Sequence, residues 1–565
     1  MTAPGNLERE VKLDVELGFE LPGLSDLEPG VVVNARPDAK LHAVYFDTPD
    51  LRLMRWGITL RHRRDLVGGE AGESEWTLKL PVDADGVAIV RNELSWPGDY
   101  GPVPAEVAGL VRGVARTGRI EPVADLISER RRLELLDEAG RMLAEIDDDL
   151  VSVMDRTRLV DRFRQVEVEV ADEAAPELVD ELLARLTAAG AVAGDDRPKV
   201  VRAIGSRASL GPDVVVPKVG PKATVATVVQ ASIAAGLTRI IRHDPGVRLG
   251  DDPEHVHQAR VGARRLRSDL KTFSRLLDEG WTTSTRAELG WLAGALGEVR
   301  DADVLTGRLR AQIRSLPDSD AKASAGLLRK LALQRDEARR RLLEVLDSDR
   351  YLILLENLSQ AAVDPPLDHP ARRGDVGPSG DGPTAATEAT HDAALSPTPI
   401  PTPTPTSTPT PGERRAADVP SAATPALGER RAVEVMVPVV GRPWKKLKRA
   451  VAAVDDDSPN EALHQVRIRA KRVRYAAEAV EPVIGKPARR LAAAAAELQG
   501  VLGDLQDAVV AEAWLRRQGS GSAAQALVAG ELVTLERQKQ AAARAAWPAA
   551  WKAASGKSSR SWLHG

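Results

Sequence analysis

The sequence predicts an α+β multidomain protein, in which an antiparallel β domain precedes an all-α domain made of two tandem helical bundles. Apolar and charged residues alternate at every second position from Leu7 to about Gly205, which indicates strands. From about Thr224 the apolar residues recur at helical spacing, in segments rich in Ala, Leu and Arg. At 565 residues the chain is also too long for a single compact domain.

The composition excludes several classes of protein. Hydrophobic residues make up 43% of the chain and charged residues 28%, so most of the chain can bury a core. The formal net charge of -4 excludes a uniformly basic nucleic-acid coat protein. The absence of cysteine excludes a disulfide framework, a thiolate metal site and a cysteine nucleophile. No run approaches ~18 apolar residues, so we expect a cytoplasmic protein without a membrane partner.

The expected strands are short runs separated by Gly, Pro and Asp turns. They cover residues 7–17, 57–64, 75–81, 91–96, 129–135, 143–153 and 163–171. One helix is expected near the end of the β domain, over residues 175–190. We place the β domain at residues 1–205 and a linker at residues 206–223.

The helical region contains an internal repeat on either side of a spacer rich in Pro and Thr. The segment from His257 to Arg267 is repeated from His464 to Arg474, and a Leu-Gly-x-x-x-Asp segment occurs in each half. The sequence therefore predicts a first half at residues 224–365, a disordered insert at 366–432, a second half at 433–558 and a tail at 559–565. The insert is expected to be an extended, solvated spacer; a docking tract is the alternative.

Residues two apart in a strand share a face, so the expected strands present charged faces. Acids concentrate on the first and the late strands, whereas the strands between them offer mostly Lys and Arg. These faces could simply meet water. Their segregation favours a closed sheet with the charged side chains inside. Such a bore would be water-filled and too polar to pack as an apolar core, so it needs an ionic ligand. Arg and Lys suit phosphoryl oxygens, and clustered carboxylates suit Mg²⁺ or Mn²⁺.

The first strand carries Glu8-Arg-Glu10-Val-Lys12, which resembles the ExExK signature of the CYTH family, the triphosphate tunnel metalloenzymes. The likeness continues in the family's order through Tyr45-Phe-Asp-Thr-Pro, Leu60-Arg-His-Arg, Trp76-Thr-Leu-Lys-Leu-Pro, Val166-Glu-Val-Glu and Arg197-Pro-Lys199. The resemblance implies an eight-stranded closed β tunnel that hydrolyses or rearranges tripolyphosphate-like substrates with a divalent metal.

The resemblance also implies residue roles. The expected catalytic residues are Glu8, Glu10 and Lys12. The expected substrate-binding residues are Arg61, Arg63, Lys79, Arg91, Arg130, Arg132 and Lys199. The expected ligands of Mg²⁺ or Mn²⁺ are Glu8, Glu10, Asp149, Glu167 and Glu169. Two points stay open: which arginines of residues 130–132 face inward, and which acid of residues 147–149 is on the metal side. The parity of Glu145 favours Asp147 and Asp149, but a shift by one residue would select Asp148.

Each repeat of the helical region carries a basic stripe that begins at a histidine. His257, Arg260, Arg264, Arg267 and Lys271 fall on one helix face at 100° per residue. His464, Arg467, Lys471 and Arg474 repeat the pattern. No acid lies between His257 and Ser268 or between His464 and Tyr475. Neighbouring helices could neutralise the stripes through Asp301, Asp303, Asp504 and Asp507. A polyanion site explains better why the stripe occurs twice.

These motifs resemble the CHAD domain, here spanning about residues 224–558. The resemblance implies a polyphosphate-binding helical module. The expected binding residues are His257, Arg260, Arg264, Arg265, Arg267, Lys271, His464, Arg467, Lys471, Arg472 and Arg474. Polyphosphate is a plausible ligand because it carries charge without bases, whereas aromatic residues for base stacking are only 3% of the chain.

We therefore predict a metal-dependent inorganic triphosphatase or polyphosphatase joined to a polyphosphate-binding domain, associated with polyphosphate granules. Tripolyphosphate or longer inorganic polyphosphate is the expected partner, and nucleic acid is not. The alternatives are a non-catalytic polyphosphate-binding protein, and a tunnel that acts on nucleotides or thiamine triphosphate, as adenylate cyclases and thiamine triphosphatases do. The sequence does not predict the oligomeric state.

Overall fold

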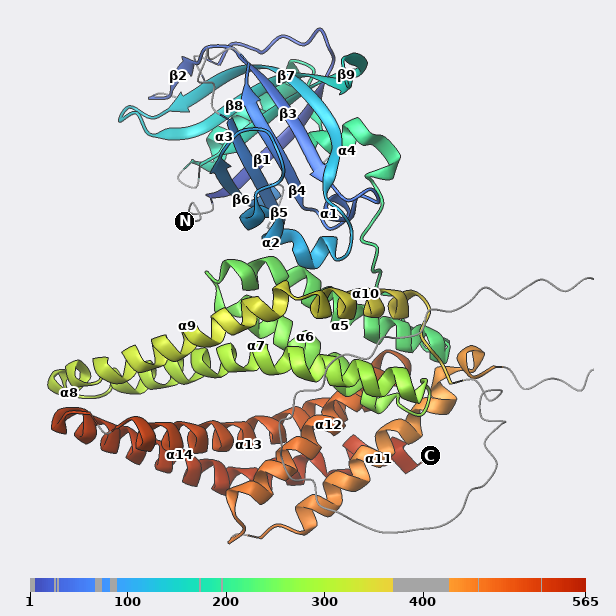
Figure 1. The fold of residues 1–565 in the computed structure, drawn as a ribbon, viewed down its shortest axis with the longest axis vertical. Coiled ribbons are helices and arrows are strands. Elements are labelled where there is room, and N and C mark those ends of the chain that lie inside the picture. The colour runs from blue at the N-terminus through green and yellow to red at the C-terminus, as the bar shows by residue number, and fades with distance from the viewer. Residues whose placement is uncertain are drawn as a thin grey trace, which may run out of the picture.

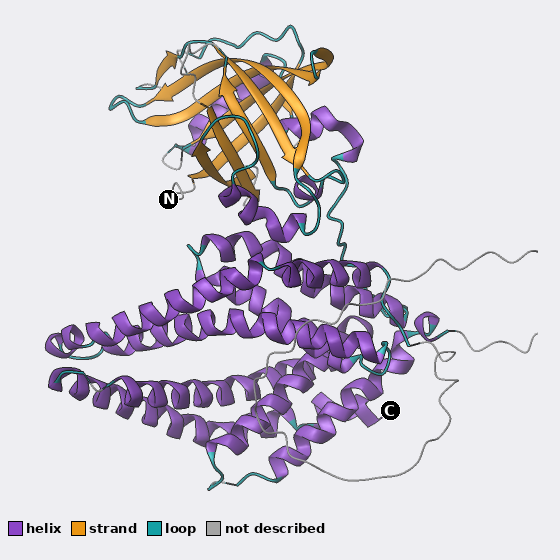
Figure 2. Cartoon of the chain, in the orientation of Figure 1, coloured by secondary structure: helices purple, strands orange, loops and turns teal. Residues whose placement is uncertain are grey.

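The computed structural model describes residues 6–24, 27, 30–66, 74–81, 89–171, 174–194, 197–368, 426–455, 457–519 and 521–564. A β domain lies above a larger helical domain, as the N-terminal strands and the helices below them show (Figures 1 and 2). This arrangement confirms the predicted fold class. Most of the predicted insert lies outside the described residues.

The β domain, here called the tunnel domain, is a 10-stranded antiparallel sheet. Its strands are β1 (Asn6–Val15), β2 (Val32–Ala35), β3 (Ala39–Asp47), β4 (Thr59–Asp65), β5 (Ser74–Pro81), β6 (Ile89–Pro97), β7 (Glu121–Leu136), β8 (Met142–Asp155), β9 (Arg158–Val170) and β10 (Val192–Ala193). Eight strands pair in the order β1-β6-β5-β4-β3-β7-β8-β9, and β9 pairs again with β1. The first half of β1 pairs with β6 and the second half with β9, and Glu10 has partners in both. The eight strands thus enclose a bore. Because β1 pairs with β6 along one half and with β9 along the other, the sheet is not closed by hydrogen bonds along its whole length.

The inside of the sheet is apolar at one end and ionic along the rest. Tyr45, Val151 and Phe163 share the inner parity and pack against Val200 and Val201. The two valines belong to α4 (Lys199–Ile204), which therefore plugs this end of the bore. The ionic side chains lie between this plug and an open mouth.

The outer face of the sheet is covered by helices. Leu178, Leu182 and Leu186 of α3 (Pro176–Ala188) pack against Ile146 and Val166. On another wall, α2 (Ala105–Ala115) packs against β5 and β6, and α1 (Arg52–Arg55) connects β3 to β4. Alternation between charged and apolar residues explains why each strand has one ionic and one apolar face.

The helical domain consists of two halves with the same layout. The first half contains α5 (Val225–Leu249), α6 (Pro253–Thr272), α7 (Glu279–Ile313), α8 (Asp318–Ala323), α9 (Ala325–Asp347) and α10 (Asp349–Val363). The second contains α11 (Ala432–Ala452), α12 (Asn460–Ile484), α13 (Lys486–Gln518), α14 (Ala523–Ala554) and α15 (Lys557–Arg560). Helices α7 with α9 and α13 with α14 form two long arms that lie one above the other (Figure 1).

The halves are related by a pseudo-two-fold axis that passes between the starts of α5 and α11. The backbone N–H of Val225 donates to the carbonyl of Arg430, and the N–H of Ala432 donates to the carbonyl of Ala223. At the spacing that relates His257 to His464, Val225 corresponds to Ala432 and Ala223 to Arg430, so the two hydrogen bonds are equivalent. The sequence repeat is therefore a structural repeat.

The two domains share one apolar core. The cluster that contains Trp76 and Leu78 of the tunnel wall continues through Val111 of α2 to Leu237 and Ile241 of α5. Arg116, which follows α2, reinforces this contact, because its buried guanidinium pairs with Asp213 of the linker and Glu356 of α10. The domains are therefore docked and not merely tethered.

Helix α5 is the one described helix with the length and hydropathy of a membrane span. Its apolar residues, among them Val229, Ile233, Leu237 and Ile241, are buried in the shared core. Its apolar character thus follows from its place in the core.

Substitution of Gly113 should weaken the docking of the domains. A Cβ at this position of α2 would lie 2.4 Å from the carboxylate carbon of Asp244 on α5. Asp244 is 2% exposed and accepts hydrogen bonds from Arg248 and Tyr351, so it cannot move freely. We expect Gly113→Ala to lower the unfolding free energy by about 1–3 kcal/mol, measured by thermal or urea denaturation.

Gly109→Ala is the matched control, because nothing lies within 4 Å of a Cβ there. Alanine should stabilise this position slightly, since it is the better helix former. Equal effects of the two substitutions would contradict the close α2–α5 contact.

Candidate functional site

A row of four acids crosses the inside of the tunnel domain. Glu134 of β7, Glu145 of β8, Glu169 of β9 and Glu10 of β1 are successive cross-strand partners, so their side chains share the bore face. Glu10 is 3% exposed. Glu134 is bound by Arg36 and Asn34. The acidic row is therefore built by strand register from four separate runs of the sequence.

Next to the acidic row is a buried cluster in which bases neutralise acids. Arg130 donates to Asp149 through Nε at 2.8 Å and Nη2 at 2.7 Å, and also pairs with Asp147. Lys199, at the start of the α4 plug, pairs with Asp149 and lies 2.5 Å from Glu167. Although burial alone would raise it, Arg130 and Lys199 lower the pKa of Asp149 to about 2. Asp149 therefore stays charged at neutral pH.

Strand register shows where the ambiguous acids of β8 lie. Asp147 and Asp149 are on the bore face with Arg130. Asp148 is on the outer face, where Arg164 binds it through two nitrogens at 2.8 and 2.6 Å. Arg130 and Arg132 are opposite Asp149 and Asp147 in the β7–β8 register, so these two arginines face the bore.

The opposite wall of the bore is basic. Lys79 of β5 lies 2.8 Å from Glu93 of β6, and Arg61 of β4 lies 3.9 Å from the same carboxylate. Arg63 pairs with Glu75 at 2.6 Å, near the open mouth. The predicted segregation of acids and bases is thus only partial, because the bases of this wall pair with Glu75 and Glu93 beside them.

The remaining predicted tunnel residues lie as follows. Lys12 is 3.3 Å from Glu10 and 3.5 Å from Glu167, beside the acidic row. Arg132 is 3.1 Å from Glu145 and 3.0 Å from Asp147. The side chains of Glu8 and Arg91 lie outside the described residues, although the two are register partners in β1 and β6.

The acidic row has the chemistry of a divalent cation site. Burial, followed by the charge of Asp147, raises the pKa of Glu145, and burial also raises that of Glu169. A divalent cation would relieve this crowding of carboxylates, and oxygen donors are what Mg²⁺ and Mn²⁺ prefer. No group of three carboxylates or histidines has converged into a formed metal cluster among the described residues. The carboxylate oxygens of the acidic row are nevertheless the kind of ligand that fits Mg²⁺ or Mn²⁺.

The bore opens through a cavity of about 330 Å³. Arg36, Arg63, Arg130, Arg132 and Glu134 line it, with Asp65 and Glu75 on the rim. This mouth leads from solvent to both the basic wall and the acidic row. A short anion could therefore reach both sets of side chains.

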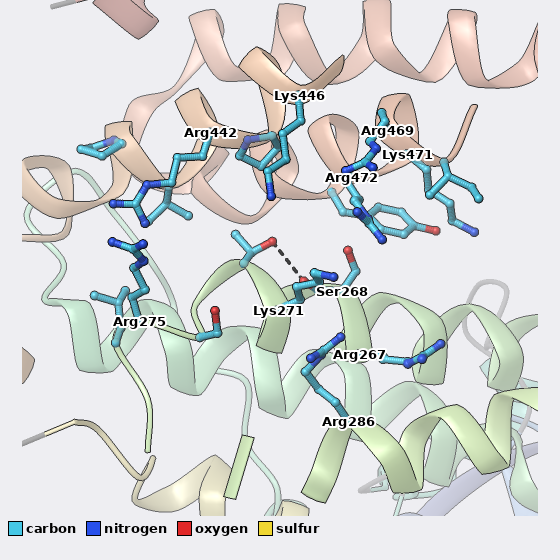
Figure 3. Close-up of a pocket in the computed structure, with 18 of the residues that line it drawn as sticks. Arg267, Ser268, Lys271, Arg275, Arg286, Arg442, Lys446, Arg469, Lys471 and Arg472 are labelled. Carbon is cyan, nitrogen blue, oxygen red and sulfur yellow. Dashed lines mark hydrogen bonds between the residues drawn. The ribbon is translucent and has the colours of Figure 1, made fainter. Parts of the chain in front are cut away.

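The helical domain has a cleft of about 680 Å³ between its halves, here called the basic cleft. Its cations are Arg264, Arg267, Lys271, Arg275, Arg286, Arg442, Lys446, Arg469, Lys471 and Arg472. No acid lines it. Figure 3 shows Arg442, Lys446 and Arg472 extending from the second half toward Lys271, Arg267 and Arg275 of the first. None of the ten has an acidic partner among the residues that the structure describes.

The inner end of the basic cleft holds cations close to one another. Burial, followed by the charges of Arg264 and Arg467, lowers the pKa of Lys471 to about 7. Burial and the charge of Arg472 also lower the pKa of Lys271. A bound anion would offset this repulsion between the cations, so the electrostatics of the cleft favour anion binding.

Other predicted stripe residues lie outside the basic cleft. Arg260 lies 3.0 Å from Asp301 of α7, while Asp303 binds Arg335. A Cβ at Gly297 would lie 3.5 Å from Arg260, and one at Gly503 would lie 3.6 Å from Arg467. The repeated Leu-Gly-x-x-x-Asp segments thus let each arginine cross a neighbouring helix. Neutralisation by acids therefore holds for Arg260 but not for the cleft.

Four further predicted residues have distinct surroundings. Arg265 and Arg474 both pair with Glu478, away from the cleft. Burial and the charge of Arg300 lower the pKa of His257. His464 is the corresponding histidine of α12, and its Nδ1 is buried without a hydrogen-bond partner. None of the four lines the basic cleft.

Sequence analysis missed half of the cations in the cleft. Arg442 and Lys446 lie four apart on α11, a spacing that could have indicated a second basic helix face. Arg469 belongs to α12 but falls off the predicted stripe. Arg275 lies in the turn that follows α6 and Arg286 lies on α7, and no local pattern joins them to the others.

The tunnel domain has a bore built from strands, with an acidic row on one side and bases on the other. It is docked on a two-fold helical bundle that contains the basic cleft. These features define a tunnel protein fused to a helical module lined with cations. The sequence matches the CYTH domain family over residues 6–200 and the CHAD domain family over residues 231–516. The chain belongs to the proteins that carry a CYTH domain followed by a CHAD domain. Both resemblances drawn from the sequence are thereby confirmed.

Two uncharacterized proteins of Mycobacterium tuberculosis, MT2285 of strain CDC 1551 / Oshkosh and Rv2226 of strain ATCC 25618 / H37Rv, are similar to this chain. Each is 30% identical over 537 residues, covering 91% of this chain and 89% of the relative. Among solved structures, PptA from Streptomyces chartreusis covers 58% of this chain and 100% of its own, at 22% identity and a TM-score of 0.41. The CHAD domain from the plant Ricinus communis covers 62% and 95%, at 25% identity and a TM-score of 0.38.

Proposed function

We propose that the tunnel domain is a metal-dependent triphosphatase that acts on tripolyphosphate-like chains. The observation that carries this proposal is the acidic row facing a basic wall inside one bore. A linear polyphosphate carries closely spaced negative charges, and the wall of Arg61, Arg63 and Lys79 offers it guanidinium and ammonium groups. The carboxylates on the opposite side would repel this anion unless a cation lies between them and the phosphates.

The side chains of the bore would act mainly by position and charge. Arg63, Arg130 and Arg132 at the mouth bind and orient the incoming chain. Lys12 and Arg61, deeper in the bore, stabilise charge that develops on the phosphoryl oxygens. Glu10, Glu145 and Glu169 would hold Mg²⁺ or Mn²⁺, which supplies further charge neutralisation when bound. The α4 plug excludes water from the far end of the bore.

We further propose that the basic cleft binds inorganic polyphosphate. The described residues that line the cleft include ten cations from both halves and no acid, so a chain bound there would replace internal repulsion by attraction. Docking of the domains keeps a bound chain near the tunnel and raises its local concentration there. Cytoplasmic polyphosphate granules are the place of action that this function predicts.

Phosphate release from four substrates tests the proposal. We expect release from tripolyphosphate, in the presence of Mg²⁺ or Mn²⁺, to exceed that from long polyphosphate, ATP and thiamine triphosphate. Release from none of them, with polyphosphate binding retained, would leave a non-catalytic binding protein. Cyclic AMP as the main product from ATP would indicate an adenylate cyclase.

Polyphosphate affinity should fall as the pH rises through about 7, because Lys471 then loses its charge. Burial and neighbouring arginines hold the pKa of Lys471 below its unfolded value, so the folded protein binds fewer protons above pH 7. The unliganded protein should accordingly become more stable as the pH rises through about 7 toward the unfolded pKa of lysine. Titration calorimetry at several pH values measures the affinity.

Lys471→Arg is the control for this pH dependence, because arginine stays charged throughout the range. The variant should keep its affinity above pH 7 while the wild-type protein loses part of it. Identical pH profiles for the two proteins would show that Lys471 does not titrate in the cleft.

A further inference from the structure

The basic cleft has a pseudo-symmetric counterpart. A second cavity, of about 380 Å³, is lined by α5, α6, α12 and the linker. At the spacing that relates His257 to His464, each α11 residue of the basic cleft corresponds to an α5 residue of the second cavity. The pairs are Val435 and Val228, Pro438 and Ala231, Val439 and Ser232, Arg442 and Ala235, Pro443 and Gly236, and Lys446 and Arg239. The two cavities are thus equivalent positions in the two halves.

The charges of the two cavities differ. Where the basic cleft has Lys271, the counterpart has Glu478, and where it has Arg275, the counterpart has Pro482. Arg469 likewise corresponds to Gly262. The counterpart also contains an additional acid, Asp269, at a position occupied by alanine in the second half. The counterpart is therefore lined by two cations, Arg239 and Arg265, and two acids, whereas the basic cleft is lined by ten cations.

The principal guanidinium of the counterpart is neutralised within the protein. Arg265 lies 2.9 Å from Asp269 and also pairs with Glu478. Asp269 is 2% exposed and accepts a hydrogen bond from Ser232 at 2.8 Å. Glu478 in turn holds Arg474 at 2.7 Å. This network joins α6 to α12 and leaves no excess of cations comparable to that of the basic cleft.

The linker from the tunnel domain occupies the edge of the counterpart. Val216, Pro217 and Val219 line it, and they follow Asp213, which Arg116 holds at the domain contact. Among the described residues, no linker segment lines the basic cleft. The linker is thus seated in one of the two equivalent cavities.

We propose that the helical domain takes a phosphate chain from one side only, at the α11 face, and that the equivalent α5 face serves as the seat of the interdomain linker. This inference rests on the proposed binding of polyphosphate to the basic cleft. It gives the binding site a direction, because the chain binds in the cavity that has the excess of cations. It also predicts a single site for a short phosphate chain in the helical domain, in addition to the one in the tunnel, despite the two-fold repeat.

Charge reversal at an equivalent pair of residues tests this inference. Lys446 and Arg239 are both exposed and correspond to each other in the two cavities. Tripolyphosphate is titrated calorimetrically into the full chain. We expect two sites in the wild-type protein, one in the tunnel and one in the basic cleft. Lys446→Glu should lower the affinity of one of them about tenfold or more, whereas Arg239→Glu should leave both within about threefold of wild type. Equal losses in the two variants, or a third site in the wild-type protein, would overturn the inference.

A gain of binding provides the second test. The double variant Asp269→Ala/Glu478→Lys gives the counterpart the residue types of the basic cleft at both positions. Because the tunnel holds one further chain, the variant should raise the stoichiometry for tripolyphosphate from two toward three. A folded double variant that still binds two chains would contradict the charge argument; if it does not fold, the Lys446 and Arg239 pair decides. Absence of any binding to the wild-type protein would overturn the proposed function itself, whereas binding unaffected by Lys446→Glu would overturn only the one-sided site.

Discussion

Replacement of Glu10 and Glu169 by glutamine should lower phosphate release from tripolyphosphate at least about 100-fold. The two residues are cross-strand partners in the acidic row, and their amides would keep the shape but remove two negative charges from the proposed cation site. Stability should not fall in parallel. Burial raises the pKa of Glu169, so a neutral side chain there avoids the cost of a buried charge.

The control for this variant is Glu129→Gln on the outer face of β7. Glu129 is exposed and lies 3.5 Å from the equally exposed Lys40, so its replacement should change neither activity nor stability measurably. Initial rates with Mg²⁺ or Mn²⁺, together with thermal unfolding of both variants, make the comparison. Full activity of the Glu10→Gln/Glu169→Gln variant would show that the acidic row is not part of the active site.

The second large effect is expected in the basic cleft. Arg264→Ala/Lys471→Ala removes two cations from its inner end, where both halves of the domain contribute. With each charged contact contributing about 1.5–3 kcal/mol, affinity for long polyphosphate should fall about 100-fold or more. The salt dependence of binding should weaken as well, because fewer counterions are released on binding.

Arg489→Ala/Arg490→Ala removes the same total charge from an exposed part of α13 and serves as the control. Fluorescence anisotropy with labelled polyphosphate, measured at several salt concentrations, separates local contacts from net charge. If both double variants lost the same affinity, the protein's overall charge and not the cleft would account for binding.

Strand parity predicted much of the tunnel because successive side chains of a strand point to opposite faces. Arg61, Arg63 and Lys79 therefore appear on the bore face as expected. Within residues 147–149, parity with Glu145 favoured Asp147 and Asp149, but a shift by one residue would have selected Asp148 because three acids follow one another. There the partners decide: Arg130 binds Asp147 and Asp149 inside, and Arg164 binds Asp148 outside.

Helical periodicity predicted one wall of the basic cleft and missed the others. Arg264, Arg267 and Lys271 share a face of α6 and do line the cleft. Arg286 and Arg442 reach it from α7 and α11, and only the tertiary packing of these helices brings them together. The sequence analysis also did not predict that Lys271 and Glu478, which are equivalent in the repeat, give the two cavities different charges. The repeat itself suggests that both halves have the same function.

A crystal structure of the full chain with tripolyphosphate and Mn²⁺ tests the central claim most directly. The account predicts anomalous scattering from Mn²⁺ beside Glu10, Glu145 and Glu169, with the phosphates between these acids and the basic wall of Arg61 and Lys79. Phosphate and Mn²⁺ bound only on the outer surface, with the bore's ion pairs unchanged, would contradict it.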